Sequence, residues 1–393
     1  MVNDHWRPAR ADIDLDAVRH NASILAGMVT PAALCAVVKA DGYGHGAAPV
    51  ARAALEGGAT WLAVALVEEG VSLREKGIEA PILLLSEPPV EAMSEAVARG
   101  LVPTVYTYGG LENLSRAAGD GRPALEVHLK VDTGMHRVGA DPEDAPGLAA
   151  TIAADPRITL GALWTHLAVA ESDDPVDREF TAAQLERFDA TVARLAAAGH
   201  PPPMTHVANS AAAIGVPTAR RDMVRCGIAL YGVAPTPALA DQIAAAGGQR
   251  LHPVLSLRTR VTYVRDLDAG ERPSYGRCRP LERRSTVATA PVGYADGVPR
   301  GLFERGGEVL IGGLRRPLAG MVTMDQVVID CGAVGTAPVE VGDEVVLLGR
   351  QGSEEVTAEE WAGLLGTISY EVLCGIGNRV PRFVVEGGGR PPV

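Results

Sequence analysis

Lysine is nearly absent from this chain, although basic residues as a class are not. Only three of the 36 basic residues are lysines, at positions 39, 76 and 130. Arginine stays protonated in proteins, whereas a lysine amine can be deprotonated and can form a Schiff base. The three lysines are therefore the first candidates for amine chemistry. Lys76 lies in an Arg-Glu-Lys-Gly segment typical of a helix end and is interpreted as a solvated charge.

Other features that the sequence lacks exclude further classes of protein. No run approaches the ~20 apolar residues of a membrane span, and the N-terminus lacks the basic-then-apolar order of a signal peptide. The net charge of −12 disfavours nucleic acid as a partner. No CxxC pair is present, so neither a disulfide framework, a cysteine zinc site nor another metal site is predicted, and a reducing cytoplasm is the expected compartment. The five cysteines are Cys35, Cys226, Cys278, Cys331 and Cys374.

The first two-thirds of the chain alternate apolar runs with helical patterns, such as residues 15–28 and 175–198. The strand-like runs are 33–39, 61–66, 81–86, 102–106, 125–131, 160–166, 204–207 and 223–230. They are continuously apolar, as strands buried on both faces should be. This alternation predicts a (β/α)8 barrel. An open doubly wound sheet is the alternative, although no GxGxxG follows the first run.

A change of texture near Thr236 predicts a second domain. Residues 1–240 are assigned to the barrel and 241–393 to a mainly β domain, with the first ~12 residues as candidates to pack on the latter. The expected strands of the β domain are 255–264, 286–292, 308–311, 326–330 and 344–348.

Polar residues end several of the apolar runs in the predicted barrel. Lys39, Lys130 and His166 stand at the ends of three of them. Active sites of such barrels lie at the C-terminal ends of the strands, and phosphate often binds after the last two. Ser210 and the backbone N–H groups near Gly227 suit a phosphate. A lysine facing a phosphate site is the arrangement that a pyridoxal phosphate enzyme needs.

Motifs along nearly the whole chain resemble those of the pyridoxal-phosphate-dependent alanine racemase family (fold type III). The first is VKADGYGHG at 38–46, which is similar to the family's cofactor-attachment segment. The others are KVDTGMHRVG at 130–139, TH at 165–166, HVANS at 206–210, RCGIALYG at 225–232, SYG at 274–276, VGYADG at 292–297, MDQ at 324–326 and ISYE at 368–371. The order of these motifs along the chain makes the resemblance specific.

The resemblance implies two catalytic bases on opposite faces of the substrate. Lys39 would hold pyridoxal phosphate as an aldimine and act as one base. Tyr275 would be the other and would reach into the partner subunit's site, its phenol tuned by His166 and Arg225. A phenol with a pKa near ~10 is a poor base unless its neighbours lower that pKa. Without the resemblance, Tyr275 would be interpreted as a packed turn aromatic.

The resemblance also implies a set of residues that bind cofactor and substrate. The cofactor-binding set is Lys39, Tyr43, His166, Ser210, Arg225, Gly227, Ile228 and Tyr370. Arg225 would face the pyridine nitrogen, although an arginine there could equally be a structural ion-pair partner. The substrate-binding set is Arg137, Met324 and Tyr294. Lys130 would be carbamylated and orient Arg137; the alternative is an ordinary lysine paired with Asp132.

The expected protein is therefore a cytoplasmic homodimer with shared sites that interconverts L-alanine and D-alanine for peptidoglycan. Two other classes stay open. A decarboxylase with the same type of barrel would lack the Tyr275 motif and carry a cysteine-containing acid/base segment. A non-catalytic pyridoxal phosphate carrier would resemble the barrel alone. Many relatives have Asn-Ala at Asp41-Gly42 and Cys at Thr323, but neither departure removes a catalytic group.

Overall fold

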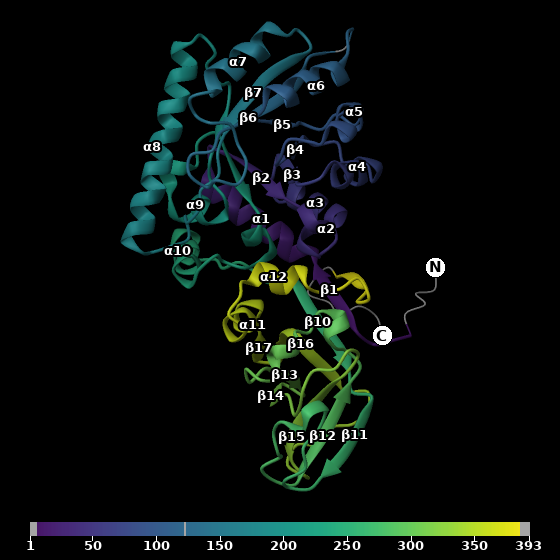
Figure 1. Cartoon of the computed structure of the whole chain (residues 1–393). Coiled ribbons are helices and arrows are strands. Elements are labelled where there is room, and N and C mark those ends of the chain that lie inside the picture. The colour runs from purple at the N-terminus through teal and green to yellow at the C-terminus, as the bar shows by residue number, and fades with distance from the viewer. Residues whose placement is uncertain (1–5, 122, 386–393) are drawn as a thin grey trace. The chain divides into compact units, whose positions relative to one another are not determined.

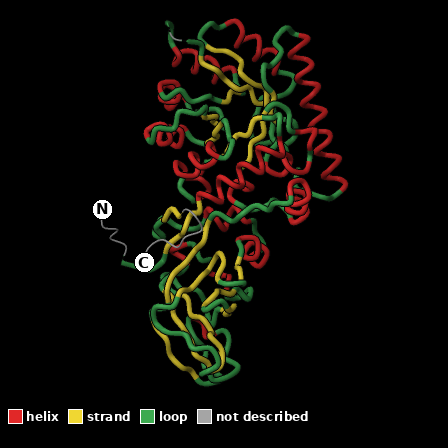
Figure 2. The backbone as a smooth tube through the Cα atoms, turned by 180° about the vertical axis from the view of Figure 1, so that it is seen from behind, coloured by secondary structure: helices red, strands yellow, loops and turns green. Residues whose placement is uncertain are grey.

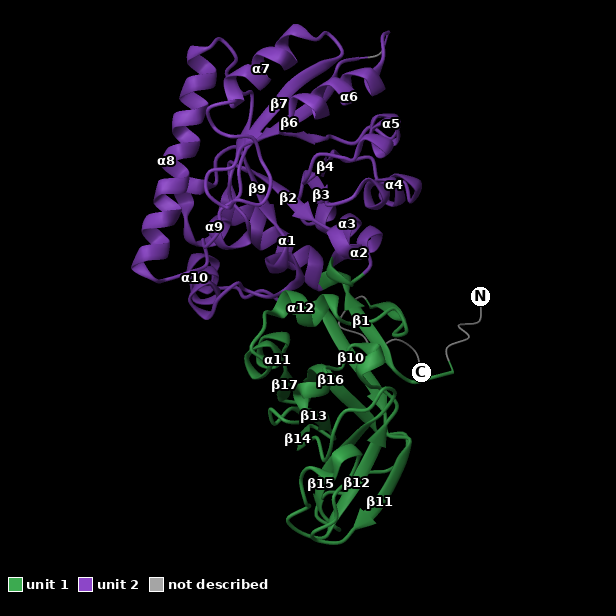
Figure 3. Ribbon diagram, viewed as in Figure 1, with its two compact units in different colours: residues 1–16, 43–45, 253–393 green, residues 17–42, 46–252 purple. Residues whose placement is uncertain are grey.

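The structure, a computed structural model, describes residues 6–121 and 123–385 (Figure 1). The chain divides by its internal contacts into two compact units, which Figure 3 colours separately. The barrel unit comprises residues 17–42 and 46–252. The β unit comprises the residues up to 16, residues 43–45 and those from 253 onward.

Within the described residues, the barrel unit contains an eight-stranded parallel sheet in the order β4-β3-β2-β9-β8-β7-β6-β5. Its strands are β2 (Ala33–Val37), β3 (Trp61–Val64), β4 (Ile82–Leu84), β5 (Thr104–Val105), β6 (Leu125–Lys130), β7 (Ile158–Trp164), β8 (Thr205–His206) and β9 (Met223–Cys226). A parallel bridge between Leu83 and Val102 brings the two edges together. The predicted (β/α)8 barrel is confirmed, because an open sheet would leave these edges apart.

Helices surround the strands of the barrel (Figure 2). They are α1 (Leu15–Val29), α3 (Ala47–Glu56), α4 (Val67–Glu75), α5 (Val90–Ala98), α6 (Tyr108–Ala118), α7 (Ala145–Ala154), α8 (Pro175–Ala197), α9 (Ser210–Gly215) and α10 (Pro237–Gly247). Helix α8 begins where Asp174 accepts the N–H of Val176 and Pro175 takes the first helical position. Phe188 and Leu195 are fully buried, as the helical spacing of apolar residues predicts.

The second unit is mainly β, as predicted. Its larger sheet has the order β14-β13-β16-β10-β1-β18, with β17 paired to β16, and its smaller sheet has the order β11-β12-β15. The strands are β1 (Arg10–Asp14), β10 (Leu255–Arg260), β11 (Tyr263–Leu267), β12 (Ser285–Ala290), β13 (Glu308–Ile311), β14 (Leu314–Pro317), β15 (Val327–Ala333), β16 (Glu344–Gln351), β17 (Glu354–Val356) and β18 (Arg382–Val385). Two short helices, α11 (Ala358–Leu365) and α12 (Ser369–Cys374), follow β17.

The two units differ from the predicted domains in their boundaries. Strand β1 lies between β10 and β18, so the first described strand belongs to the sheet of the β unit. The expected boundary at 240/241 falls inside α10, and the units divide between His252 and Pro253. The Pro- and Ala-rich stretch forms a helix there because Thr236 accepts the N–H of Leu239 and Pro237 occupies the first helical position.

Candidate active site

Lys39 follows strand β2 at the start of an unusual turn. The strand ends at Val37, two residues earlier than predicted. Ala40, Asp41 and Gly42 then have φ of 53°, 49° and 63°. Non-glycine residues rarely adopt this left-handed conformation. Side chains brace the turn, since Asp41 accepts the N–H of Ala47 and Glu69 accepts that of Ala40 at 2.6 Å.

Glu69 is a residue of this region that sequence reasoning missed. Its carboxylate, on α4, also accepts the N–H groups of Ala65 and Leu66, which follow strand β3. One carboxylate thus fixes the backbone after two neighbouring strands, beside Lys39. Its position three residues after Leu66, in the first turn of α4, is the spacing of a capping glutamate, although Leu66 lacks the side-chain oxygen of a full capping box.

Arg225 occupies the barrel interior at the end of β9 and is only 3% exposed. Its Nη1 donates to Nδ1 of His206 at 2.7 Å. Its Nη2 donates to the carbonyl oxygens of Thr165 and Val207, at 2.9 and 3.0 Å, and lies 3.3 Å from Nδ1 of His166. These partners are carbonyls and imidazoles rather than carboxylates. Burial is the cause that lowers the pKa of the Arg225 guanidinium to about 10.

The protonation state of His166 follows from these neighbours. Burial is the largest cause that lowers its pKa well below the usual value, followed by the charges of Arg225 and Arg137. His166 is therefore neutral at pH 7. A guanidinium only donates, so Nδ1 of His166 accepts from it and the ring hydrogen sits on Nε2. The ring can present that hydrogen to an acceptor.

Lys130 ends strand β6 and is 4% exposed. Burial, followed by the charges of Arg225 and Arg137, lowers the pKa of its amine to about 7. The Nζ atom lies 4.4 Å from the centre of the Trp164 ring, and the Arg225 guanidinium lies 4.5 Å from the same ring. Asp132 accepts the N–H groups of Gly134 and His136, so it shapes the loop that carries Arg137.

Four cationic side chains therefore gather at the C-terminal ends of the barrel strands. Each of Lys39, Lys130, Arg137 and Arg225 acts by its charge on the pKa of His166. Positive charges that lie close together repel one another unless an anion lies among them. The cluster fits an anionic molecule, and pyridoxal phosphate with an amino acid carboxylate is such a molecule.

Ser210 and Gly227 meet in the barrel unit, as their predicted role requires. Both are buried, and the N–H of Gly227 donates to Oγ of Ser210 at 2.9 Å. The predicted strand 223–230 stops at Cys226, because Gly227 has φ −105° and ψ −93° and Ile228–Tyr231 turns into a 3-10 helix. The turn gathers a hydroxyl and backbone N–H groups into one small buried region, which suits a phosphate.

Tyr43 and Tyr370 come together in the β unit. Their ring centres are 6.0 Å apart and tilted by 45°. The carbonyl oxygen of Tyr43 lies 2.9 Å from Nδ1 of His45, and Nε of Arg382 donates to the carbonyl of Gly44. Two phenols expected to bind one phosphate are thus neighbours.

Tyr275, Tyr294 and Met324 also lie in the β unit and are exposed, by 73%, 43% and 52%. The N–H of Tyr294 donates to the carbonyl of Thr323, and that of Ala295 to the carbonyl of Met324, so these two segments are joined. Large apolar side chains at such exposure often mark a contact surface.

Buried Asp296 anchors the turn that carries Tyr294. Its carboxylate accepts the N–H of Gly293 at 2.9 Å and pairs with Arg7 and Arg379. Its side chain is 0% exposed, so this carboxylate is fully enclosed by its partners.

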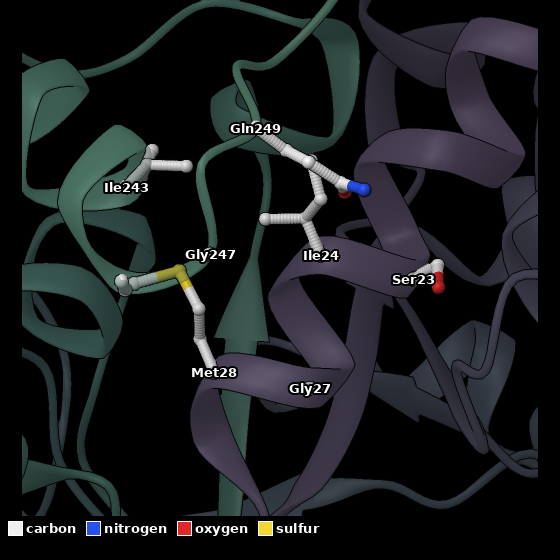
Figure 4. Close-up of a pocket in the computed structure, with 8 residues that line it drawn as sticks. Ser23, Ile24, Gly27, Met28, Ile243, Gly247 and Gln249 are labelled. Carbon is white, nitrogen blue, oxygen red and sulfur yellow. The ribbon is translucent and has the colours of Figure 1, made fainter.

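A cavity of about 390 Å³ in the barrel unit lies between α1 and α10 (Figure 4). Ile24, Met28, Ile243 and Gln249 are among the residues that line it. None of the predicted site residues lines it, and its lining lacks charged groups. It does not belong to the candidate active site.

Sequence analysis placed His206 in the HVANS motif without a role of its own, and it missed His128 and Glu126. Nε2 of His206 lies 3.1 Å from Nδ1 of His128, whose Nε2 lies 3.0 Å from Oε1 of Glu126. His206, His128 and Glu126 thus form a line of polar contacts that leads away from Arg225.

Comparison with known proteins places nearly the whole chain in one family. The family model described as "Alanine racemase, N-terminal domain" matches residues 13–235. The model described as "Alanine racemase, C-terminal domain" matches residues 254–384. An alanine racemase from Symbiobacterium thermophilum is 47% identical over 383 residues, covering 98% of each chain.

Solved structures give the same result. The alanine racemase from D-cycloserine-producing Streptomyces lavendulae has a TM-score of 0.88 and 38% identity, covering 97% of this chain and 98% of that one. The alanine racemase from E. faecalis has a TM-score of 0.87 and 36% identity, covering 98% of this chain and all of that one.

Proposed function

The chain belongs to the alanine racemase family, and from that premise we propose that it interconverts L-alanine and D-alanine on pyridoxal phosphate with Lys39 and Tyr275 as its two bases. Both family models match, and together they cover nearly the whole chain. This match is the observation that supports alanine racemase activity, which is an isomerase reaction on an amino acid. The cofactor and the residue roles are supported by the geometry of each unit.

The cationic cluster supports pyridoxal phosphate as the cofactor. When bound, this cofactor withdraws electrons from an amino acid and so acidifies the proton on its α-carbon. Lys39 would hold it covalently. Ser210, the N–H groups of Gly227 and Ile228, and the phenols of Tyr43 and Tyr370 would bind the phosphate, for which the bond between Ser210 and Gly227 is already suitable.

Arg225 would face the pyridine nitrogen and govern the type of reaction. Its pKa of about 10 keeps the guanidinium charged at pH 7. A cation beside this nitrogen disfavours its protonation, whereas the acid found in aminotransferases promotes it. Protons would then return to the α-carbon rather than elsewhere, which favours racemisation over transamination.

His166 would tune Tyr275 of the partner subunit. Neutral His166, which accepts from Arg225 at Nδ1, has its hydrogen on Nε2 and can donate it to a phenolate. A hydrogen bond to a phenolate stabilises its negative charge. Tyr275 would remove or deliver the α-proton on one face of the substrate, and the Lys39 amine would serve the other face.

Arg137 would pair with the substrate carboxylate. Lys130 would be a carbamate, whose negative charge would orient Arg137. A neutral amine attacks the carbon of CO2 and releases a proton, leaving an anionic carbamate. The Lys130 amine, with its pKa of about 7, has a substantial neutral fraction at pH 7. A negative charge at this position would also relieve repulsion among Arg137, Arg225 and Lys39.

The exposed residues of the β unit support a homodimer with shared sites. Tyr275, Tyr294 and Met324 are all large and exposed in the single chain. In a head-to-tail dimer, Tyr294 and the Met324 backbone would line the substrate entrance of the other subunit's site, beside Tyr275. D-alanine would serve peptidoglycan synthesis in the cytoplasm, with neither nucleic acid nor membrane as a partner. Across the residues described, no helix has the length and apolar character needed to cross a membrane.

A panel of L-amino acids tests this proposal. The protein with pyridoxal phosphate should convert L-alanine to D-alanine faster than it racemises any other L-amino acid, as measured by chiral chromatography. A rate for L-alanine no faster than for the other amino acids would contradict the assignment of the substrate. Release of CO2 without an enantiomer would instead identify a decarboxylase of this fold.

A further inference from the structure

A line of polar side chains runs through the barrel interior away from Arg225. The guanidinium on β9 contacts His206 on β8, which contacts His128 on β6, and His128 contacts Glu126 on the same strand. The two imidazoles are fully buried, whereas the Glu126 side chain is 44% exposed. The line therefore connects a buried cation to a carboxylate that water can reach.

With Arg225 in its observed place, only one direction is consistent for each hydrogen bond in this line. The guanidinium only donates, so Nδ1 of His206 accepts at 2.7 Å. Burial is the main cause that lowers the pKa values of His206 and His128, so both rings are neutral. The hydrogen of His206 is then on Nε2 and is donated to Nδ1 of His128, which in turn carries its hydrogen on Nε2.

The Glu126 carboxylate completes this order at the other end. Its Oε1 lies 3.0 Å from Nε2 of His128 and can only accept when ionised. The bond from His128 is the main cause that lowers the pKa of Glu126, which keeps the carboxylate ionised. A carboxylate therefore selects the same tautomers that Arg225 requires.

The opposite tautomers would disrupt the contact with Arg225. If His128 carried its hydrogen on Nδ1, it would face His206 as a donor, and His206 would have to accept at Nε2. The hydrogen of His206 would then be on Nδ1, pointing at a guanidinium N–H. Two donors facing each other at 2.7 Å repel, so Arg225 would lose a partner or move.

The surrounding backbone and rings hold this line in place. A Cβ added to Gly161 on β7 would lie 2.4 Å from Cγ and 2.5 Å from Oε1 of Glu126, so the glycine makes room for the carboxylate. Trp164 stacks on His206 with ring centres 5.3 Å apart. Trp61 lies 5.4 Å from His128. The rings cannot turn freely to find other partners.

We propose that Glu126 is a positioning residue for the racemase reaction: through His128 and His206, its carboxylate fixes the tautomers that hold the Arg225 guanidinium in place. The functional part of this inference rests on the proposed function of Arg225. The tautomer part concerns the chain alone. Glu126 touches neither substrate nor cofactor in this account.

The tautomers can be measured directly by nitrogen NMR of protein labelled with ¹⁵N-histidine. The chain has nine histidines, and the His128→Gln and His206→Asn variants assign the two signals. In the unmodified chain, both rings should be protonated at Nε2 only. In Glu126→Ala, His128 should become a mixture of tautomers. Glu112→Gln, an exposed glutamate on α6 paired with Arg116, is the matched control and should leave both rings unchanged.

A double-variant cycle links the tautomers to the reaction. Glu126→Ala and Gly161→Ala should each lower kcat by about tenfold, the effect of one charge-assisted hydrogen bond, with KM for alanine changed less than about twofold. If Gly161→Ala acts by displacing Glu126, it should cause no further loss in Glu126→Ala protein. Gly109→Ala on α6, where an added Cβ meets open space, is the control for a glycine change.

Each result has a defined meaning. Mixed tautomers in Glu126→Ala, together with non-additive losses of kcat, support the proposal. Tautomers that stay protonated at Nε2 in Glu126→Ala overturn it, as do losses that add in the double variant although circular dichroism shows folded protein. Absence of racemase activity in the unmodified protein would refute the proposed function instead, and the NMR result would still decide the role of Glu126 in the line.

Discussion

The two units present their predicted site residues in different ways. In the barrel unit, Arg225 and Lys130 are almost fully buried among imidazoles, carbonyls and an indole ring. In the β unit, Tyr275 and Met324 are more than half exposed. Burying a cation without a carboxylate partner costs free energy. The buried cations of the barrel unit therefore indicate that an anionic ligand binds there. The β unit suggests a second protein surface by exposed apolar area. In the proposed dimer, the barrel unit of one subunit would supply the charged part of the site, and the β unit of the partner subunit would complete it.

The largest expected effect tests the barrel half. Lys39→Ala should lower racemase activity by about 10³-fold or more, because it removes a base and the covalent link to the cofactor. It should also abolish the visible absorption of protein mixed with pyridoxal phosphate and then desalted. The matched control is Lys76→Ala, an exposed lysine at the end of α4, which should retain both properties. Retained absorption in Lys39→Ala would contradict the assignment.

The next effect tests whether the β half serves another subunit. Tyr275→Phe alone should lose activity by about 10²-fold or more, because the phenol supplies a proton transfer. Mixed with Lys39→Ala protein after dissociation, it should recover roughly a quarter of normal activity, since half of randomly formed dimers carry one intact site. Mixtures no more active than either variant would show that each chain uses its own Tyr275.

A smaller effect is expected for Asp296, which holds a turn of the β unit in place and takes no part in proton transfer. Asp296→Ala should destabilise the protein by about 2 kcal/mol, because it leaves the buried N–H of Gly293 unpaired and removes the ion pair with Arg7. KM for alanine should rise more than kcat falls, since Tyr294 loses its anchored turn. Urea denaturation and steady-state kinetics measure both. Glu282→Ala, an exposed pair with Arg283, should change stability by less than about 0.5 kcal/mol.

The smallest effect concerns pH and Lys130. A pKa of about 7 means that the neutral fraction of the amine rises from about a tenth at pH 6 to about nine tenths at pH 8. Carbamylation should therefore increase with pH over this window, seen as a ¹³C signal from labelled bicarbonate. Lys130→Arg should lack the signal. A signal independent of pH, or none at pH 8, would favour an ordinary lysine.

The sequence was sufficient for most of the fold and for the motifs of the site. Eight apolar runs coincide with the eight strands of the barrel, because strands buried on both faces are read from continuous hydrophobicity. Strand ends were less accurate, as at Gly227, where backbone angles rather than side-chain type end β9. Strand β1 was not predicted as a strand, because its pairing with β10 joins residues about 240 positions apart.

The contacts that lead from Arg225 through His206 to His128 and Glu126 could not be predicted from the sequence, for a related reason. His128 lies 78 positions from His206, and β6 has an irregular register against β7 beside it. Neither the register nor the direction that a side chain takes inside a barrel can be read from one chain. Gly161 had no signal of its own, although its missing side chain makes space for Glu126.

The central claim is that two bases act on the substrate, Lys39 from the barrel unit and Tyr275 from the β unit. The most direct test is to measure how much deuterium from the solvent each enantiomer contains early in the reaction. L-alanine is incubated with the protein and pyridoxal phosphate in D2O. The enantiomers are then separated, and the deuterium content of each is measured by mass spectrometry. If one base removes the proton and another delivers it, D-alanine should carry deuterium while the remaining L-alanine stays mostly unlabelled. Equal deuterium in both enantiomers from the earliest times would contradict the account, because a single base would then serve both faces.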